Sequence, residues 1–330
     1  MKVYRLSVRA AAALVFLLTA SLSVLSWPRA LDTVGGLALV MSTGLLLAGY
    51  FLLGSGEVLE GLRGWLDVRP ARVVIFPAAL WSIYALYAVG TGTATPGRAL
   101  RVALYVGVPF LLLAPAVTRK QFPASTWFEP VAMLWVWLAL EVSWVRTIFA
   151  YPGSRLDYVL GQLLGVNLAL AVFALWRRLP GIGYRFECHR ATLAAAGSNF
   201  LLFAVLGIPL GLGSGFIRYS YSAEKWLQVP VWLVTIFLFT ALPEELLFRG
   251  LIQNWLELRT RNRQIGLLLA ALIFGAAHLG NGPPHPNWRY FLLASLAGVF
   301  YGRAWQRTGS LLASSLTHTL VNTSWALFFR

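Results

Sequence analysis

Ionisable and amide side chains lie inside three apolar stretches in the last third of this 330-residue chain. The stretches are Pro243-Glu244-Glu245-Leu-Leu-Phe-Arg249, Phe274-Gly-Ala-Ala-His278 and His318-Thr-Leu-Val-Asn322. A charged side chain at the centre of a bilayer costs at least about 2.5 kcal/mol, so it usually has a functional reason to be there. A carboxylate with an imidazole can deprotonate a water, and imidazole or amide N–H groups can stabilise an oxyanion. These residue types together could hydrolyse a peptide bond.

The spacing of the first stretch separates its two carboxylates. Glu245 and Arg249 are four residues apart, so on a helix they face each other, with the acid in the favourable amino-terminal position. Glu244 points about 100° away and is free for another role. Pro243 loosens the hydrogen-bond ladder just before them and can widen the helix there. An ion pair that only fixes helix packing is the alternative for Glu245 and Arg249.

The other two stretches each place a histidine four residues from a partner on the same helix face. Phe274 precedes His278, and His318 precedes Asn322. A single histidine on an apolar face is more often a packing residue than a catalyst. Two histidines, a carboxylate and an amide in three separate spans favour catalysis. We therefore expect Glu244 and His278 to hold and deprotonate a water, and His318 and Asn322 to donate to the oxyanion.

The composition predicts that a membrane surrounds these residues. Hydrophobic residues make up 58% of the chain and charged residues 12%, against about 25% charged in a soluble domain. The 14 Trp are typical of interfacial aromatic belts. The net charge of +15 does not indicate nucleic-acid binding, because the basic residues lie in short clusters between apolar runs. The single cysteine excludes an internal disulfide framework.

About eleven apolar runs approach the roughly 20 residues that a helix needs to cross a bilayer. They are residues 10–27, 34–53, 73–89, 102–117, 131–145, 159–176, 191–212, 229–255, 265–279, 291–302 and 311–329. We predict an all-α, polytopic transmembrane bundle of about 10–11 spans, with the site among its carboxyl-terminal helices. The first run could instead be a secretory signal, but it lacks a convincing cleavage site.

The distribution of basic residues predicts an orientation. With the amino terminus in the cytoplasm, the inner segments hold about twice as many Lys and Arg residues as the outer ones. We therefore expect an integral protein of the cell (inner) membrane with a cytoplasmic amino terminus. The segment 177–190, which contains Cys188, lies on the inner side in this arrangement. The polar connection Gly54 to Arg72 is expected to hold an interfacial helix.

The three stretches, in this order, resemble the EExxxR, FxxxH and HxxxN motifs of the CPBP family of intramembrane proteases, which includes the CaaX endopeptidases. The resemblance covers roughly Ala191 to Arg330, so residues 186–330 are expected to form the protease domain and residues 1–185 a set of amino-terminal helices of unassigned role. It implies that Glu244 is the base, supported by Glu245 and Arg249. His278 would share the water, and His318 with Asn322 would form the oxyanion site.

The resemblance also implies a substrate and leaves two alternatives. The substrate would be a membrane-associated protein or peptide cut near the bilayer, close to a lipidated or hydrophobic carboxyl terminus. Zinc held by Glu244, His278 and His318 is one alternative. We favour a mechanism without a cofactor, because HExxH is absent and Asn322 is a poor zinc ligand. The other alternative is a non-enzymatic transporter or scaffold that uses the Glu-Glu-Arg cluster as an ion relay.

Overall fold

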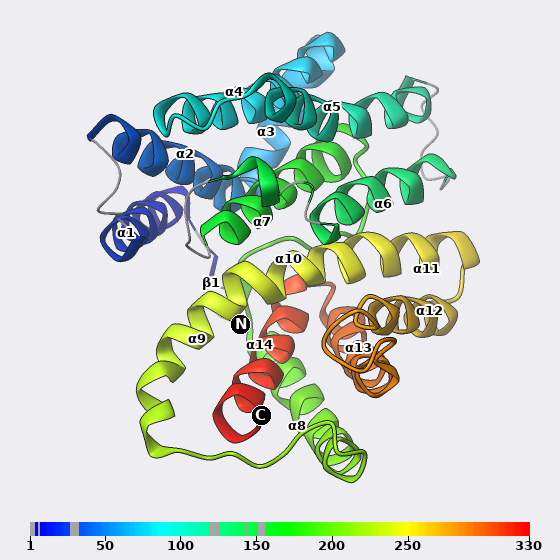
Figure 1. Ribbon diagram of the computed structural model, residues 1–330. Coiled ribbons are helices and arrows are strands. Elements are labelled where there is room, and N and C mark those ends of the chain that lie inside the picture. The colour runs from blue at the N-terminus through cyan, green and yellow to red at the C-terminus, as the bar shows by residue number, and fades with distance from the viewer. Residues whose placement is uncertain are drawn as a thin grey trace. The chain divides into compact units, whose positions relative to one another are not determined.

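The computed structural model describes residues 4–5, 7–26, 33–118, 126–142, 144, 146–150 and 156–330. In these ranges the regular elements are helices, apart from one antiparallel pair of two-residue strands, β1 (Tyr4–Arg5) and β2 (Glu187–Cys188), and an isolated bridge between Tyr219 and Phe329. The predicted all-α class is confirmed (Figure 1). The contacts divide the chain into two units: Leu6–Pro180, and Gly181–Arg330 together with the strand β1.

The unit Leu6–Pro180 is built from helices that pack mainly on their neighbours in sequence. Its elements are α1 (Val8–Ser26), α2 (Thr33–Leu52), α3 (Gly56–Val68), η1 (Pro70–Val74), α4 (Ile75–Gly90), α5 (Pro96–Thr118), α6 (Phe128–Glu141), η2 (Arg146–Ile148), α7 (Leu156–Ala169) and η3 (Leu170–Trp176). The helix α7 with η3 is the most buried, and it contacts α2, α4, α5, α6 and α3. A buried ion pair joins η3's carboxyl end to α6, with 2.7 Å between Nε of Arg177 and Oε1 of Glu129.

The polar connection from Gly54 to Arg72 contains the helix α3, as its charge pattern predicts. Leu66 is its buried apolar residue. Arg63 donates through Nη2 to the carbonyl oxygen of Ala174 at 2.6 Å, and Asp67 pairs with Arg178. The helix ends at Val68 because Arg69, which precedes Pro70, adopts an extended conformation. These contacts attach α3 to the end of η3.

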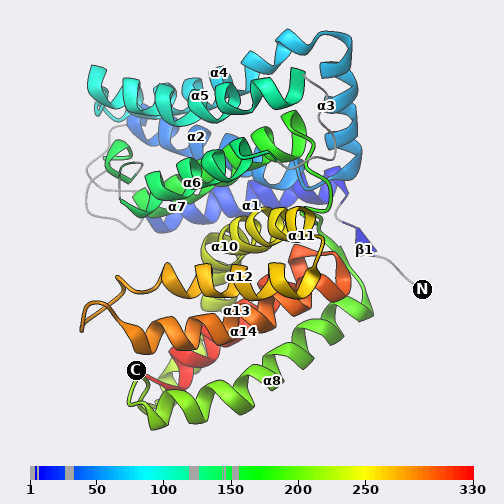
Figure 2. The same cartoon turned by 90° about the vertical axis from the view of Figure 1, so that its right-hand side faces the viewer.

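The unit Gly181–Arg330 contains all three motif stretches. Its helical elements are α8 (Arg190–Gly213), η4 (Ala223–Gln228), α9 (Val229–Ile236), η5 (Phe237–Ala241), α10 (Leu242–Glu245), η6 (Leu246–Gln253), α11 (Asn254–Thr260), α12 (Arg263–Ala276), α13 (Trp288–Thr308) and α14 (Leu311–Phe328). The elements from α9 to α11 follow one another without a break. Helix α13 packs on α8, α12 and α14, and these helices lie side by side in both views (Figures 1 and 2).

Asparagine and serine side chains fix where the last three helices begin. Asn262 accepts hydrogen bonds from the first backbone N–H groups of α12, Asn287 from that of Tyr290 in α13, and Ser310 from that of Leu312 in α14. Each satisfies a donor that the helix itself leaves unpaired. Gly309 ends α13 at φ 64°, a left-handed conformation that glycine adopts without strain. The turn between α13 and α14 is therefore encoded locally.

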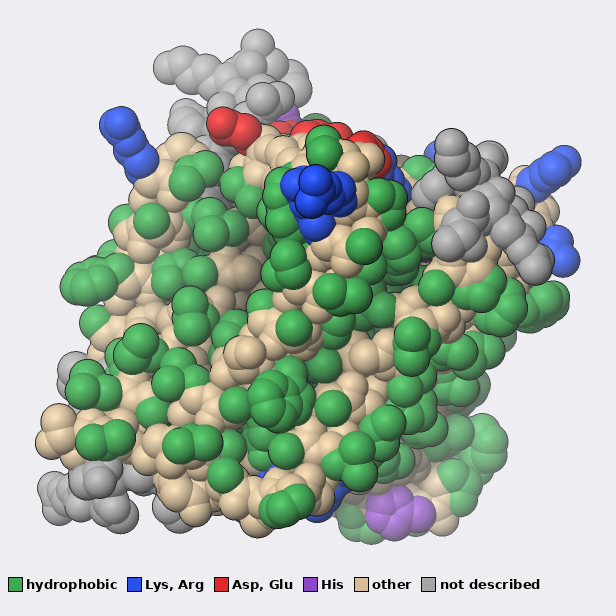
Figure 3. Space-filling model, turned by 90° about the horizontal axis from the view of Figure 1, so that it is seen from above, with side chains coloured by type: hydrophobic (Ala, Val, Ile, Leu, Met, Phe, Trp, Pro, Cys, Tyr) green, Lys and Arg blue, Asp and Glu red, His purple; other side chains and the backbone are tan. Residues whose placement is uncertain are grey.

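Every apolar run predicted from the sequence contains a helix. Within the residues that the structure describes, six helical segments are long and apolar enough to cross a membrane: Thr33–Leu52, Pro70–Gly90, Pro96–Val117, Leu156–Trp176, Arg190–Gly213 and Ala223–Thr260. Hydrophobic side chains cover most of the face in Figure 3, and the visible charged side chains lie mainly toward its upper margin. These helices indicate an integral membrane protein. Helices α13 and α14, which carry site residues, are not among the six.

Candidate active site

The two adjacent glutamates lie where the long helix α9–α11 departs from regular α-helical geometry. The short segment α10 is flanked by the π-helical segments η5 and η6. Pro243 has no backbone N–H to donate, so the ladder is interrupted next to the glutamates, as the sequence predicts. Single π-helical turns inside α-helices occur often at functional sites. The widened helix carries Glu244 and Glu245 into different surroundings.

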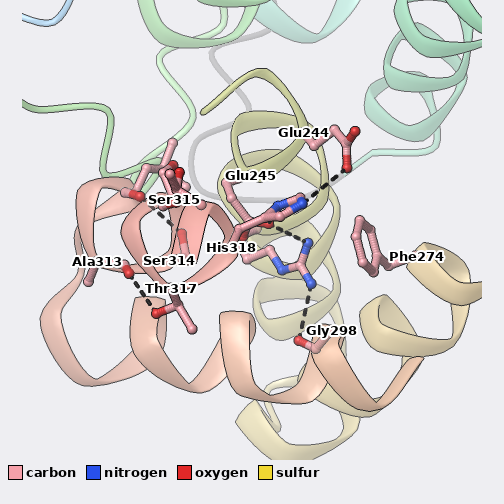
Figure 4. Close-up of polar contacts among 12 residues, drawn as sticks. Glu244, Glu245, Phe274, Gly298, Ala313, Ser314, Ser315, Thr317 and His318 are labelled. Atoms are coloured by element: carbon pink, nitrogen blue, oxygen red, sulfur yellow. Dashed lines mark hydrogen bonds and ion pairs between the residues drawn. The ribbon is translucent and has the colours of Figure 1, made fainter. Parts of the chain in front are cut away.

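Glu245 is fully buried between two cationic or polar partners. Its Oε1 accepts a hydrogen bond from Nη1 of Arg249 at 3.1 Å, the pairing that the four-residue spacing predicts. The same oxygen lies 2.9 Å from Nδ1 of His318 in α14. Because a carboxylate only accepts, this contact requires the proton on Nδ1 of His318. Glu245 thus joins α10 to α14 and orients the imidazole (Figure 4).

Arg249 is also buried, and contacts with two other helices restrain its guanidinium. Nη2 donates to the carbonyl oxygen of Gly298 in α13 at 3.1 Å. The guanidinium carbon lies 4.5 Å from the centre of the Phe274 ring and 5.3 Å from that of Tyr301. Stacking on aromatic faces suits the planar guanidinium better than a lysine ammonium. Arg249 therefore connects α10, α12 and α13 behind the carboxylate of Glu245.

Glu244 occupies a more open position than its neighbour. Its side chain is 30% exposed, whereas that of Glu245 is 0% exposed. Oε2 of Glu244 lies 3.9 Å from Nε2 of His318, too far for a direct hydrogen bond. Figure 4 shows the imidazole of His318 between the two glutamates. The histidine expected to stabilise the oxyanion therefore also stands beside the expected base.

His278 lies just beyond a helix and not inside one. The predicted span reached Leu279, but α12 ends at Ala276, and His278 is in the turn that follows. Its Nδ1 lies 2.8 Å from the carbonyl oxygen of Phe274, which leaves Nε2 for other partners. The imidazole packs against the rings of Phe274 and Tyr290, with centroids 4.7 and 4.6 Å away.

One cavity of about 200 Å³ collects the exposed members of the predicted set. Glu244, His278, His318 and Asn322 all line it, with Phe274 beside them. Glu245 and Arg249 are not among its lining residues and support it from behind. Most of the wall is apolar or aromatic and comes from α8, the segment that follows α8, α13 and α14; it includes Phe203, Phe216, Leu293, Ala297, Val321 and Trp325. Most of the surface that a bound substrate would contact is therefore apolar.

Two tyrosines of α13 belong to this site although the sequence analysis did not single them out. Tyr301 stacks on His318, with ring centroids 4.5 Å apart and an interplanar angle of 16°. Tyr290 packs on His278. Both line the cavity. The sequence signal available was two tyrosines eleven positions apart, a spacing of about three helical turns that places them on one face.

Glu244, His278 and His318 carry side-chain atoms that can bind zinc. Among the residues that the structure describes, no group of three or more His, Cys, Asp or Glu is placed to hold a metal ion. His278 and His318 each already use Nδ1 within the protein. This leaves each Nε2 free, as in histidines that bind zinc. What speaks against a three-ligand site is only that the described donors do not lie close enough together to hold the ion.

Comparison with known proteins places this region in a protease family. Residues 226–324 match the family described as "Type II CAAX prenyl endopeptidase Rce1-like". The carboxyl-terminal region therefore contains an Rce1-like, CPBP-family domain, and the family implies a protease that acts on a protein or peptide substrate. The matched range includes Glu244, Glu245, Arg249, His278, His318 and Asn322.

A curated relative extends the likeness beyond this range. An "Uncharacterized 24.3 kDa protein" of Escherichia coli is 28% identical over 182 residues, which cover 55% of this chain and 80% of that protein. No solved structure matches the chain.

Proposed function

We propose that the protein is an intramembrane endopeptidase in which Glu244 and His278 activate a water molecule. The observation that carries the proposal is the shared cavity lined by Glu244, His278, His318 and Asn322. A base, a second proton-transfer group and two oxyanion donors are the parts that hydrolysis of an amide needs. Three separate elements, α10, the turn after α12, and α14, bring them together.

In the proposed reaction the water oxygen attacks the carbonyl carbon of the scissile bond while Glu244 accepts a water proton. His278 orients the same water through Nε2, because its Nδ1 is held by Phe274. The oxyanion of the tetrahedral intermediate accepts hydrogen bonds from the amide of Asn322 and from Nε2 of His318, which in this proposal carries a proton on both ring nitrogens throughout the reaction, beside the carboxylate of Glu245. Glu244 next gives its proton to the leaving nitrogen as the carbon–nitrogen bond breaks.

Glu245 and Arg249 act in this proposal without touching the substrate. The hydrogen bond from Nδ1 of His318 to Glu245 turns Nε2 toward the cavity. Arg249 compensates the buried charge of Glu245 and holds it in place. Both residues therefore preorganise the oxyanion donor, which spares reorganisation during the reaction.

The apolar wall of the cavity supports a hydrophobic, membrane-associated substrate. Aromatic and aliphatic side chains from α8, α13 and α14 surround the polar group. We propose that the substrate is a membrane-associated protein or peptide cut near a lipidated or otherwise hydrophobic carboxyl terminus.

The proposal is tested by purifying the protein in detergent and comparing Glu244→Gln with the unaltered chain on a library of hydrophobic peptides. Mass spectrometry of new termini measures cleavage. We expect Glu244→Gln to abolish it, whereas Glu224→Gln, a change at an exposed position in η4, leaves it intact. Retained cleavage in Glu244→Gln would overturn the mechanism. If the unaltered chain cuts nothing while Glu244→Gln abolishes proton or ion flux in liposomes, the relay function is correct instead.

Cleavage assays with a metal chelator distinguish the metal-dependent mechanism from the metal-free one. A zinc ion would polarise the substrate carbonyl and lower the pKa of a bound water. Cleavage that survives a strong chelator supports the metal-free mechanism. Loss of cleavage with the chelator, and recovery on adding zinc, would replace it with the zinc mechanism on Glu244, His278 and His318.

A further inference from the structure

Each of the two imidazoles of the candidate site rests on a tyrosine of the same helix. Tyr301 stacks on His318 with centroids 4.5 Å apart and planes 16° apart. Tyr290 lies with its ring centroid 4.6 Å from that of His278, at an interplanar angle of 54°. The two histidines come from different elements, the turn after α12 and the helix α14, whereas both tyrosines belong to α13. Helix α13 therefore contacts both imidazoles from one side.

The face of α13 that carries these two tyrosines forms one wall of the cavity. Tyr290, Leu293, Ala294, Ala297 and Tyr301 all line the cavity, at successive offsets of 3, 1, 3 and 4 residues. These offsets keep to one helix face. Two large aromatic residues thus stand about 16 Å apart along the axis, at about 1.5 Å per residue. The smaller side chains between them leave space for a substrate.

Hydrogen bonds alone do not fix the plane of either imidazole. His318 makes one short contact through Nδ1, to Glu245, and a ring held at one atom can still tilt about that contact. The nearly parallel face of Tyr301 restricts this tilt on one side. The ring of Phe274 lies nearly perpendicular to the imidazole, with the two ring centroids 5.9 Å apart. His278 is held through Nδ1 by Phe274 and limited by Tyr290 in the same way.

From these contacts we propose that Tyr290 and Tyr301 are positioning residues that fix the orientation and separation of His278 and His318. The inference rests on the proposed peptidase function. The aromatic faces carry this role, and the phenolic hydroxyl groups do not. Tyr301 is 2% exposed and lies against Arg249 as well, so its ring is itself held firmly. Helix α13 thus sets the distance between the two imidazoles and their orientations, although it contains none of the three motifs.

The test compares Tyr301→Phe with Tyr301→Leu in the purified full-length chain on a peptide that the unaltered protein cleaves. We expect Tyr301→Phe to keep kcat within about twofold, and Tyr301→Leu to lower kcat about 100-fold with KM nearly unchanged, since small misplacements of catalytic groups cost about this much. Phe300 is a buried aromatic residue on another face of α13 and serves as the control. Phe300→Leu should keep kcat within about twofold of the unaltered chain. Thermal unfolding of each variant is measured beside the kinetics.

Three outcomes overturn the inference. An equal loss of kcat in Tyr301→Phe and Tyr301→Leu would assign the role to the hydroxyl group. Full activity in Tyr301→Leu would show that Tyr301 has no such role. A rise in KM of Tyr301→Leu with kcat unchanged would make Tyr301 a substrate contact. If Tyr301→Leu does not accumulate as folded protein, the half-buried Tyr290 is tested by the same pair of changes with the same criteria. Glu244→Gln in the same assay tests the peptidase function separately, because its retained activity would refute that function whatever the tyrosines do.

Discussion

At the scale of single residues, the two adjacent glutamates differ because of what surrounds them. Glu245 is enclosed and shares one oxygen between Arg249 and His318, whereas Glu244 opens into the cavity. The helical spacing predicted this division, because residues one position apart point about 100° away from each other. The same rule predicted the contact of Arg249 with Glu245. It could not predict that His318 from another helix would lie between the two glutamates, since spacing within a helix carries no information about packing between helices.

The buried ion pair leads to a prediction about stability. Arg249→Met should destabilise the protein by about 3–5 kcal/mol, because it leaves the carboxylate of Glu245 buried without its cation. Combining it with Glu245→Gln should recover part of the loss. Asp67→Asn, which breaks the exposed pair with Arg178, should cost no more than about 1 kcal/mol. Unfolding in detergent with increasing denaturant measures all of these. A loss in Arg249→Met as small as that in Asp67→Asn would contradict the account.

A second prediction concerns Asn322, the proposed oxyanion donor. Asn322→Ala should lower kcat about 10²- to 10³-fold, the usual loss for one such donor, and change KM little. The side chain lines the cavity and is only partly buried, so the fold should tolerate the change. Steady-state kinetics on a cleaved peptide provide the measurement. An unchanged kcat would exclude Asn322 from the oxyanion site.

At the scale of elements, the positions of the site's side chains depend on close helix packing and on the irregular geometry of the helix that carries the two glutamates. The hydrophobic runs predicted where helices lie, because apolar length decides this directly. They did not reveal that α12 ends before His278 or that α10 lies between two π-helical segments. Pro243 predicts the irregularity beside the glutamates, because it cannot donate to the hydrogen-bond ladder, whereas the end of α12 depends on packing partners that a single helix does not specify. Helix α13 carries no motif, and only its contacts with His278 and His318 show its importance.

A glycine at the crossing of α12 and α13 and a second glycine on α8 give a matched pair of substitutions. A Cβ on Gly275 would lie 2.7 Å from the backbone oxygen of Phe291, so Gly275→Ala must push the two helices apart. It should lower both the unfolding temperature and kcat. A Cβ on Gly197 in α8 meets nothing within 4 Å, so Gly197→Ala should be neutral or stabilise the helix by up to about 1 kcal/mol. Equal behaviour of the two variants in thermal unfolding and cleavage assays would contradict the packing described.

At the scale of the whole molecule, membrane residence follows from composition, whereas the role of residues 1–185 does not. The unit Gly181–Arg330 contains every residue of the candidate site, and we propose that it forms the catalytic part. The unit Leu6–Pro180 has its own buried ion pair between Arg177 and Glu129 and its own central helix. Composition predicts that such helices enter the membrane, but without a motif it does not assign them a function.

The predicted orientation can be tested with the protein's own single cysteine. Cys188 is partly exposed in β2 and lies in a segment expected on the cytoplasmic side. A membrane-impermeant maleimide should label it only after the cells are permeabilised. In a Cys188→Ser background, Ser222→Cys, placed in an exposed segment expected on the outer side, should label in intact cells. Labelling in the reverse pattern would invert the orientation.

The central claim is that residues from separate elements act on one water, and a double-variant kinetic cycle tests it most directly. Glu244→Gln and His278→Ala are compared singly and together on one cleavable peptide at high enzyme concentration. Groups that act as a unit are strongly non-additive, so the double variant should lose little beyond the roughly 10³-fold loss of the worse single variant. Losses that multiply, to about 10⁶-fold, would show that the two residues act independently and would contradict the account.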